Sequence, residues 1–324
     1  MPDILKKIKE KIYSVVRKQP KKYSFSVSDI FFANCIQGEL LRWDVAVKYL
    51  AIENYYGKND FGFNLYAKMQ NLRTGDDVAD KAIENFKNLI VSWETNGYDE
   101  KSCIYLDSDF TLQNGAHRLA MALYHNMPYI NTHLLHRGKS ASFGRDWFQK
   151  KGFTEDELSI IDSKSQELFR KANRPFTFII WSPAVHLADN ILNDLSAYGE
   201  ISNIRKYSSS KKVHEKIIRN IYSIDDIAKW KIDKKVEFFS EFNPEFICAD
   251  VLFPYHNFKM NNAGTDIVSS VCMSAKREIR AIYKDKIDNY IYDVILHACD
   301  NFQQTDLMNA YLSESEAVNY TLTV

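Results

Sequence analysis

The stretch LQNGAHRLAMAL, residues 112–123, places a glycine turn, a histidine and an arginine at the expected start of a helix. The first backbone N–H groups of a helix have no partner within it, and the helix dipole makes this end positive. Gly115 permits a left-handed backbone or close approach by a ligand. Arg118 could bind two phosphate oxygens with its planar guanidinium group, and His117 could donate a hydrogen bond or transfer a proton. Asn114–Arg118 is therefore a candidate phosphate-binding turn, with an asparagine-capped helix start as the alternative.

The segment 105–130, YLDSDFTLQNGAHRLAMALYHNMPYI, resembles the signature of the ParB/sulfiredoxin-like superfamily, in which a strand leads into an Asp/Asn-Gly-x-His-Arg turn and an alanine-rich helix. In element order the resemblance extends over residues 23–152. It implies that the turn holds nucleotide phosphates. Ala116 stands where sulfiredoxins have their reactive cysteine, so that activity is not expected. The acidic-basic-basic run and the helix-turn-helix of partition proteins are not recognisable, so the kinase branch is favoured.

The kinase branch uses a carboxylate from an earlier element as its base. Glu39, Asp44 and Asp60 are the candidates, and the sequence does not separate them. Arg73, in the segment LYAKMQNLRTG, is a candidate second phosphate ligand, with an ordinary surface arginine as the alternative.

A second candidate site lies in YDVILHACDNFQQTDLMNAYL, where His297 ends a strongly apolar segment and Asp300 follows three residues later. A histidine can act as a nucleophile where a neighbouring group fixes its tautomer and phosphates gather in front of it. The alternative is a histidine that only satisfies its hydrogen bonds at the end of a strand.

Residues 174–318 resemble nucleoside diphosphate kinase in the order of their elements. FIIWSPAV stands for that family's first strand and Lys-Pro-Asp turn, REIRAIY for its late Ile-Arg pair, and LHACDNFQQTDL for its His-Gly-Ser-Asp motif and last helix. The resemblance implies that His297 is the phosphate acceptor, Asp300 its supporting acid and Arg280 a phosphate ligand.

Several positions depart from the pattern of that family. Trp181 occupies the place of the lysine, and Ala298–Cys299 replace the Gly-Ser pair. Lys276 and its neighbour Arg277 could restore the lost positive charge if the helix turns them inward. Nucleoside diphosphate kinase activity itself is therefore not expected.

Two sets of elements must position these sites. The first half is expected to contain helices that stop at Gly57 and Gly97, a strand over 23–32 and a turn over 108–115. The second half follows the order βαβ(αα)βαβα, which predicts a four-stranded sheet of the split βαβ type with helices packed on it. The expected strands of that sheet are 174–183, 200–209, 245–255 and 290–300.

The predicted fold class is α/β (α+β), with a ParB/sulfiredoxin-like domain followed by a ferredoxin-like split βαβ domain. The expected division is a basic amphipathic helix over 1–22, the first domain over 23–152, a linker helix over 153–173 and a nucleoside-diphosphate-kinase-like domain over 174–324. Apolar residues and lysines alternate over 4–22. Contact with an anionic membrane surface is one interpretation of that helix, and a solvated cap on the next domain is the other.

The composition is that of an ordinary globular protein, with 45% apolar and 26% charged residues. A formal net charge of zero gives no overall field to attract nucleic acid, which is therefore not an expected partner. The five cysteines form no CxxC pair, which favours a reducing cytoplasm over a disulfide framework or a zinc knuckle. No apolar run reaches the ~18 residues of a membrane span, and no signal peptide is recognisable.

Both candidate sites point to phosphoryl-transfer chemistry. The leading hypothesis is a nucleotide-dependent kinase or phosphotransferase that acts on a small molecule or a glycan intermediate, with ATP or another nucleoside triphosphate and Mg²⁺. One alternative is a ParB-like DNA-binding protein or nuclease, with a basic face around Arg118, Arg137, Lys139 and Arg145. The other is a non-catalytic nucleotide-sensing module, which Trp181 favours.

Overall fold

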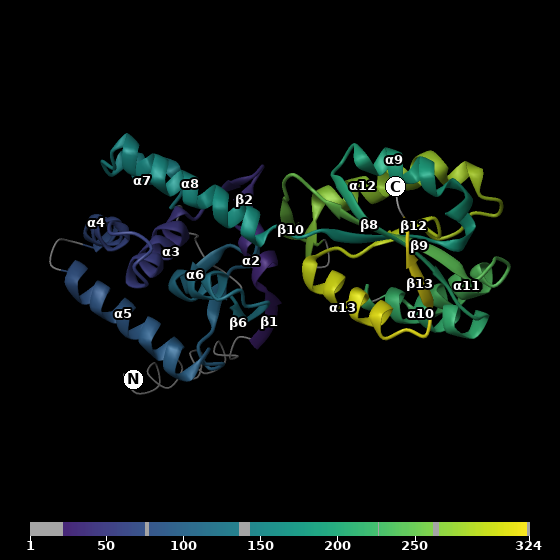
Figure 1. The fold of residues 1–324 in the computed structure, drawn as a ribbon, viewed down its shortest axis with the longest axis horizontal. Coiled ribbons are helices and arrows are strands. Elements are labelled where there is room, and N and C mark those ends of the chain that lie inside the picture. The colour runs from purple at the N-terminus through teal and green to yellow at the C-terminus, as the bar shows by residue number, and fades with distance from the viewer. Residues whose placement is uncertain (1–21, 75–77, 136–142, 226, 262–265, 323–324) are drawn as a thin grey trace, which may run out of the picture. The chain divides into compact units, whose positions relative to one another are not determined.

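A computed structural model describes residues 22–74, 78–135, 143–225, 227–261 and 266–322, and shows a mixed α/β protein (Figure 1). The chain forms two compact units. The first consists of the described residues up to Val27 together with Arg42–Ile161. The second consists of Ser28–Leu41 together with the described residues from Asp162 onward. The predicted amphipathic helix over 1–22 lies outside the described residues, apart from Lys22.

The first unit contains a mixed four-stranded sheet in the order β1-β6-β4-β5. The central pair β6 and β4 is parallel, and the two outer pairs are antiparallel. Its elements are β1 (Lys22–Ser26), α3 (Trp43–Tyr55), α4 (Gly62–Thr74), α5 (Ala79–Asn96), β4 (Ile104–Leu106), β5 (Leu112–Asn114), α6 (Ala116–Tyr124), β6 (Tyr129–Leu134) and α7 (Arg145–Lys150). Helix α8 (Glu155–Ala172) follows and crosses the boundary to the second unit.

Two glycine stops in this unit are confirmed. Helix α3 ends just before Gly57 and α5 just before Gly97, and both glycines have a φ of +71°. Positive φ carries little penalty for glycine, because it has no Cβ, so these positions end the helices.

The predicted strand over 23–32 is only partly correct. Strand β1 ends at Ser26, and helix α2 (Val27–Ala33) follows. The alternation in SFSVSD imitates a strand, but Ile30, Phe31 and Phe32 are all fully buried. A helix that is buried on all sides has no polar face from which its period could be recognised. The predicted turn over 108–115 also contains a short strand, β5.

The second unit contains a five-stranded antiparallel sheet in the order β12-β7-β9-β8-β13. Figure 1 shows α9 and α12 on one face of this sheet and α10, α11 and α13 on the other. Its strands are β7 (Phe176–Ile180), β8 (Glu200–Ser208), β9 (Glu245–Leu252), β12 (Leu296–Ala298) and β13 (Val318–Thr321). Its helices are η2 (Ser182–Leu187), α9 (Ala188–Ser196), α10 (Lys211–Ile224), α11 (Lys229–Phe239), α12 (Ser270–Tyr283), η3 (Lys284–Lys286) and α13 (Phe302–Ser313). Two small hairpins pair β2 (Cys35–Ile36) with β3 (Glu39–Leu40), and β10 (Phe258–Met260) with β11 (Ile267–Ser269).

The four expected strands are present in this sheet, and β13 is an additional edge strand. Every residue of β7 is buried, because helices cover both faces of the sheet. The predicted strand over 290–300 is shortened to the three residues of β12. Tyr292 and Asp293 have positive φ values of 38° and 59°, which are incompatible with a strand.

Asp29 attaches the segment Ser28–Leu41 to the rest of the second unit. Its buried carboxylate accepts hydrogen bonds from the backbone N–H groups of Phe302 (2.9 Å) and Gln303 (3.1 Å), at the start of α13. A carboxylate at a helix N-terminus satisfies amides that have no partner within the helix. Burial nevertheless raises the pKa of Asp29 to about 7.

All five cysteines are buried and unpaired. Within the described ranges, none of the helices combines the length and the apolar composition needed to span a bilayer.

We expect the stability of the protein to carry a pH dependence that comes from Asp29. Because its pKa is higher in the folded state than the ordinary value of 3.8, its contribution is greatest below pH ~4 and falls as the pH rises towards about 7. The slope from one such group is at most ~1.4 kcal/mol per pH unit. Urea unfolding of the wild type and of Asp29→Asn between pH 4.5 and 7 measures it. The free energy of unfolding of the wild type should fall relative to that of Asp29→Asn as the pH rises. The control Asp288→Asn, at an exposed position, should show the same pH dependence as the wild type. A pH-independent difference in unfolding free energy between the wild type and Asp29→Asn would contradict the prediction.

Candidate functional site

The turn before α6 has the backbone that its glycine suggested. Gly115 is the N-cap of α6, with φ +100° and ψ 20°, and no side chain caps the helix. A Cβ at this position would lie 2.6 Å from Cγ2 of Ile104, so only glycine fits here. Asn114 is exposed at the end of β5 and does not cap the helix. The backbone amides at the start of α6 are thus left without a side-chain cap.

Asp107 shapes the loop that leads into this turn, and it was not among the residues predicted for the site. Its buried carboxylate accepts hydrogen bonds from the backbone N–H groups of Asp109 and Thr111 (both 2.9 Å) and from the side chain of Gln113 (2.8 Å). The available signal was an aspartate two residues before a polar turn residue, which is typical of an Asx turn.

His117 is packed among aromatic rings. Its Nε2 lies 2.8 Å from the hydroxyl of Tyr66, and its ring lies 4.5 Å from that of Phe86. Burial holds the pKa of His117 well below its usual value, and the charges of Lys48 and Arg73 act in the same direction. A neutral imidazole held in this way is suited to packing and hydrogen bonding.

Arg118 is half-buried, and one of its nitrogens donates a long hydrogen bond of 3.4 Å to the carbonyl of Cys103. Its Nε is buried, and no group in the described ranges accepts a hydrogen bond from it. Arg73 is exposed, with its guanidinium group 4.5 Å from the ring centroid of Phe143.

Asp44 is the centre of a buried ion cluster. Its carboxylate is bonded by Arg42 through two nitrogens (2.8 and 2.9 Å) and by Lys48 (2.8 Å). Although burial opposes ionisation, Lys48 and Arg42 hold the pKa of Asp44 well below its usual value. Arg42 also donates to the carbonyl of Leu112 in β5. The cluster thus connects the start of α3 to the strand that carries the turn, and leaves Asp44 a weak base.

The other two candidate bases are exposed. Asp60 lies in the loop between α3 and α4. Glu39 lies in β3, which belongs to the second unit and not to the unit that carries the turn.

His297 lies in β12, opposite Ile179 of β7, and its side chain is closed to solvent. Its Nδ1 is 3.7 Å from a carboxylate oxygen of Asp225, and its Nε2 is 4.0 Å from the sulfur of Cys299. Burial holds the pKa of His297 well below its usual value, with further lowering by the positive charges of Lys276 and Arg280. The imidazole is therefore neutral, and it is not presented to a ligand in this structure.

Asp300, the expected supporting acid, pairs with Lys276 (2.6 Å) and not with His297. The ammonium group of Lys276 also donates to the carbonyl of Ala298 (2.7 Å). One helical turn later, Nε of Arg280 donates to the carbonyl of Leu296 (2.9 Å), and its guanidinium group lies 3.4 Å from Asp293. Lys276 and Arg280 thus connect α12 to β12.

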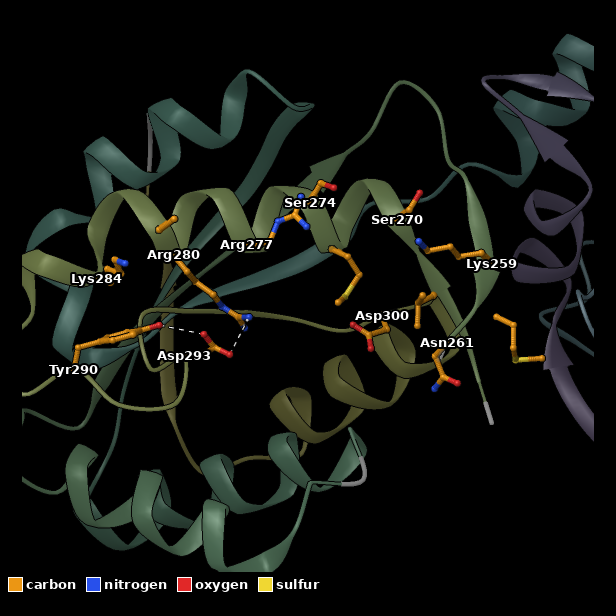
Figure 2. A pocket seen from close by; sticks show the side chains of 14 residues that line it. Lys259, Asn261, Ser270, Ser274, Arg277, Arg280, Lys284, Tyr290, Asp293 and Asp300 are labelled. Atoms are coloured by element: carbon orange, nitrogen blue, oxygen red, sulfur yellow. Dashed lines mark hydrogen bonds and ion pairs between the residues drawn. The ribbon is translucent and has the colours of Figure 1, made fainter. Parts of the chain in front are cut away.

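A cavity of about 750 Å³ lies along α12 (Figure 2). Four cations and two carboxylates line it: Lys259, Arg277, Arg280, Lys284, Asp293 and Asp300. The hydroxyl groups of Ser270, Ser274 and Tyr290 also line it. Figure 2 shows Arg280 and Tyr290 directed at Asp293, with Lys259 and Asp300 toward the other end. Of the residues predicted for the second site, the cavity therefore brings together Arg280 and Asp300, while His297 is not part of its lining.

The residues that α12 contributes to the cavity lining follow a regular spacing along the sequence. Ser270, Ser274, Arg277 and Ala281 recur every three or four residues, so they share one face of the helix, and Lys284 directly after α12 continues this spacing. This polar face was recognisable in principle, but a charged helix face is usually only solvated.

No family model, curated protein or solved structure matches this chain.

We expect Gly115→Ala to destabilise the protein by about 2–4 kcal/mol, because the new Cβ would meet Ile104 as well as a left-handed backbone. Gly57→Ala is the matched control. It also has positive φ, but nothing lies within 4 Å of its Cβ position, so it should cost only about 1 kcal/mol. Urea unfolding measures both, and equal losses would contradict the close packing against Ile104.

We expect Asp44→Ala to destabilise the protein by about 3–5 kcal/mol, because it would leave Arg42 and Lys48 buried without a counter-charge. Asp60→Ala, at an exposed loop position, should change stability by less than ~0.5 kcal/mol. Thermal and urea unfolding give these values. A stable Asp44→Ala protein that has lost only an activity would instead assign Asp44 a catalytic role.

Proposed function

We propose that the protein binds a phosphorylated small molecule, with a nucleoside triphosphate as the leading ligand, in the cavity along α12. The observation that carries this proposal is the surplus of positive charge among hydroxyl groups in that cavity. Arginine and lysine bind phosphate oxygens directly, and serine and tyrosine hydroxyls supply neutral donors. A volume of about 750 Å³ suits a ligand of nucleotide size.

The surplus charge becomes clear once the ion pairs are assigned. Asp293 lies beside Arg280 and Asp300 pairs with Lys276, so both carboxylates already have a cation.

The remaining cations of the cavity have no such partner. Among the described residues, no carboxylate lies within ion-pair distance of Lys259 or Lys284. Arg277 has only a 4.0 Å contact with Glu278 on the exposed side of the helix. These three cations remain available to an anion, and clustered charges of one sign in a cleft concentrate such a ligand.

The strand order supports the finer assignment of the second unit. The order β12-β7-β9-β8, with α9 after the first strand and α12 before the fourth, is that of a ferredoxin-like split βαβ unit. The pair α10 and α11 lies between β8 and β9, which follows the element order proposed from the resemblance to nucleoside diphosphate kinase. The arrangement β4, β5, Gly115 and α6 is compatible with the ParB/sulfiredoxin-like assignment of the first unit.

Phosphoryl transfer is the second candidate function, and the two carboxylates inside the cavity favour it. Asp293 is more than half exposed, so it could accept a proton from an acceptor hydroxyl or bind a Mg²⁺ ion that arrives with the nucleotide. Phosphate acceptance by His297 is less favoured, because its side chain is only 2% exposed. The acceptor on this proposal remains a small molecule or a glycan intermediate.

Titration calorimetry with ATP and Mg²⁺ tests the proposal. Arg277→Ala and Lys284→Ala should each weaken ATP binding roughly tenfold, which corresponds to the loss of one charge-assisted contact. Lys229→Ala removes an equally exposed cation outside the cavity, so it should leave binding unchanged. No saturable binding, or equal affinity in all four proteins, would contradict the proposal. Salt-dependent binding of duplex DNA in its place would favour the DNA-binding alternative.

A further inference from the structure

Three potential metal ligands, from the end of α10 and from the segment of β12, meet in the second unit. Asp225 ends helix α10, His297 lies in β12 and Cys299 follows that strand. One carboxylate oxygen, one imidazole nitrogen and the sulfur all lie within 4.8 Å of one another. His297 and Cys299 are closed to solvent, while the side chain of Asp225 is 19% exposed. The cluster is therefore internal, with access on the side of Asp225.

The three side chains do not satisfy one another by strong hydrogen bonds. The distance of 3.7 Å from Nδ1 of His297 to Asp225 is too long for a hydrogen bond, and the 4.0 Å contact to the sulfur of Cys299 is weak. Oδ1 of Asp225 is buried, and no protein group in the described ranges donates a hydrogen bond to it. An unsatisfied buried polar atom costs about 1–3 kcal/mol, so a site of this kind needs a further partner.

The ligand atoms of the three side chains lie within reach of a single ion after a modest inward movement. Zinc–ligand bonds of about 2.0–2.3 Å place tetrahedral ligand atoms roughly 3.3–3.6 Å apart. The 3.7 Å distance starts at Nδ1 of His297 and the 4.0 Å distance at Nε2, and one ion can bind only one of these two nitrogens. With one nitrogen of the imidazole, the three ligand atoms lie within 4.8 Å of one another, so binding a single ion requires inward shifts of up to about 1 Å. We propose that Asp225, His297 and Cys299 form a three-ligand site for a divalent cation of the zinc type.

The donor set decides which class of ion fits. A sulfur ligand together with an imidazole favours Zn²⁺ or Co²⁺ over Mg²⁺ and Ca²⁺, which prefer oxygen ligands. Three protein ligands leave a fourth position of the tetrahedron for water or a small ligand, as in catalytic zinc sites. This site is independent of the nucleotide-binding proposal and uses none of the residues that line the cavity.

Three cations near the cluster are hydrogen-bonded to groups other than its three ligands. Lys276 is bonded to Asp300 and to the carbonyl of Ala298, and Arg280 to the carbonyl of Leu296. Lys235 donates to the carbonyl of Tyr292. Burial raises the pKa of Asp225 to about 7 and the pKa of the Cys299 thiol well above its usual value, and the charge of Lys276 opposes both shifts. A bound divalent ion would displace the proton of the thiol, and the carboxylate and thiolate would then balance the two charges of the metal.

Cobalt titration of the full-length chain, after treatment with a chelator, tests the site. We expect one equivalent of Co²⁺ to bind with a thiolate-to-cobalt charge-transfer band, and Zn²⁺ to displace it. Cys299→Ser should abolish the band and weaken Zn²⁺ binding by at least about tenfold. Cys248→Ser replaces an equally buried cysteine of β9, so it should keep both.

Asp225→Asn provides a second variant in case Cys299→Ser does not fold. It should keep the charge-transfer band, weaken Zn²⁺ binding by at least about tenfold and reduce the rise in thermal stability that Zn²⁺ gives the wild type. Binding of less than one equivalent to the wild type would overturn the proposal. So would a band that survives in a folded Cys299→Ser protein, or full Zn²⁺ affinity in Asp225→Asn.

Discussion

The hydrogen bonds from Lys276 and Arg280 to the carbonyls of Ala298 and Leu296 fix α12 against β12, and both candidate sites of the second unit depend on them. Strand β12 is at the edge of its sheet, so the carbonyls on its outer side have no partner strand. Covering an edge with charged side chains satisfies these groups and prevents pairing with another chain. Lys276 and Arg280 are one helical turn apart in α12, and this spacing lets each reach one of two carbonyls that are two residues apart along β12.

The cations around α12 fall into two groups, those bonded within the fold and those that line the cavity. Lys276 and Arg280 are used by the fold, since each has a carbonyl and a carboxylate beside it. Arg277 of α12 and Lys284, which directly follows that helix, line the cavity and have no comparable internal role among the described residues. The first pair positions the strand that carries His297, while the second pair is available to a ligand.

In the first unit, Arg42 and Lys48 are likewise bonded to Asp44, which reduces the positive charge available at the glycine turn.

Local patterns predicted the elements that depend on local chemistry. Gly57 and Gly97 ended their helices because positive φ is a property of the residue itself, and the turn at Gly115 followed from the same reasoning. Pairings over long sequence distances could not be predicted from one sequence. Asp29 meets Phe302 at the far end of the chain, and nothing in its neighbourhood of Val, Ser, Ile and Phe indicates that partner.

At the candidate sites too, local sequence indicated individual residues but not their partners from distant parts of the chain. The motif around His297 located the histidine, but its contact with Asp225 joins residues 72 positions apart (297 − 225), so Asp300 appeared to be the natural partner. For His117, the neighbours are the aromatic rings of Tyr66 and Phe86 and not the expected phosphate.

Asp44 differs from the two histidines because its partners are close in sequence. Arg42 stands two residues before it and Lys48 four residues after it, and the ion cluster could have been inferred from this spacing.

Hydrogen exchange of the full-length protein, followed by mass spectrometry with and without ATP and Mg²⁺, tests the central claim that α12 lines the ligand site. We expect ATP to slow amide exchange in Ser270–Tyr283 and in Phe258–Met260, two of the segments that border the cavity. Unchanged exchange in these segments at saturating ATP would contradict the account. Slowing confined to Ala116–Tyr124 would move the nucleotide site to the glycine turn of the first unit.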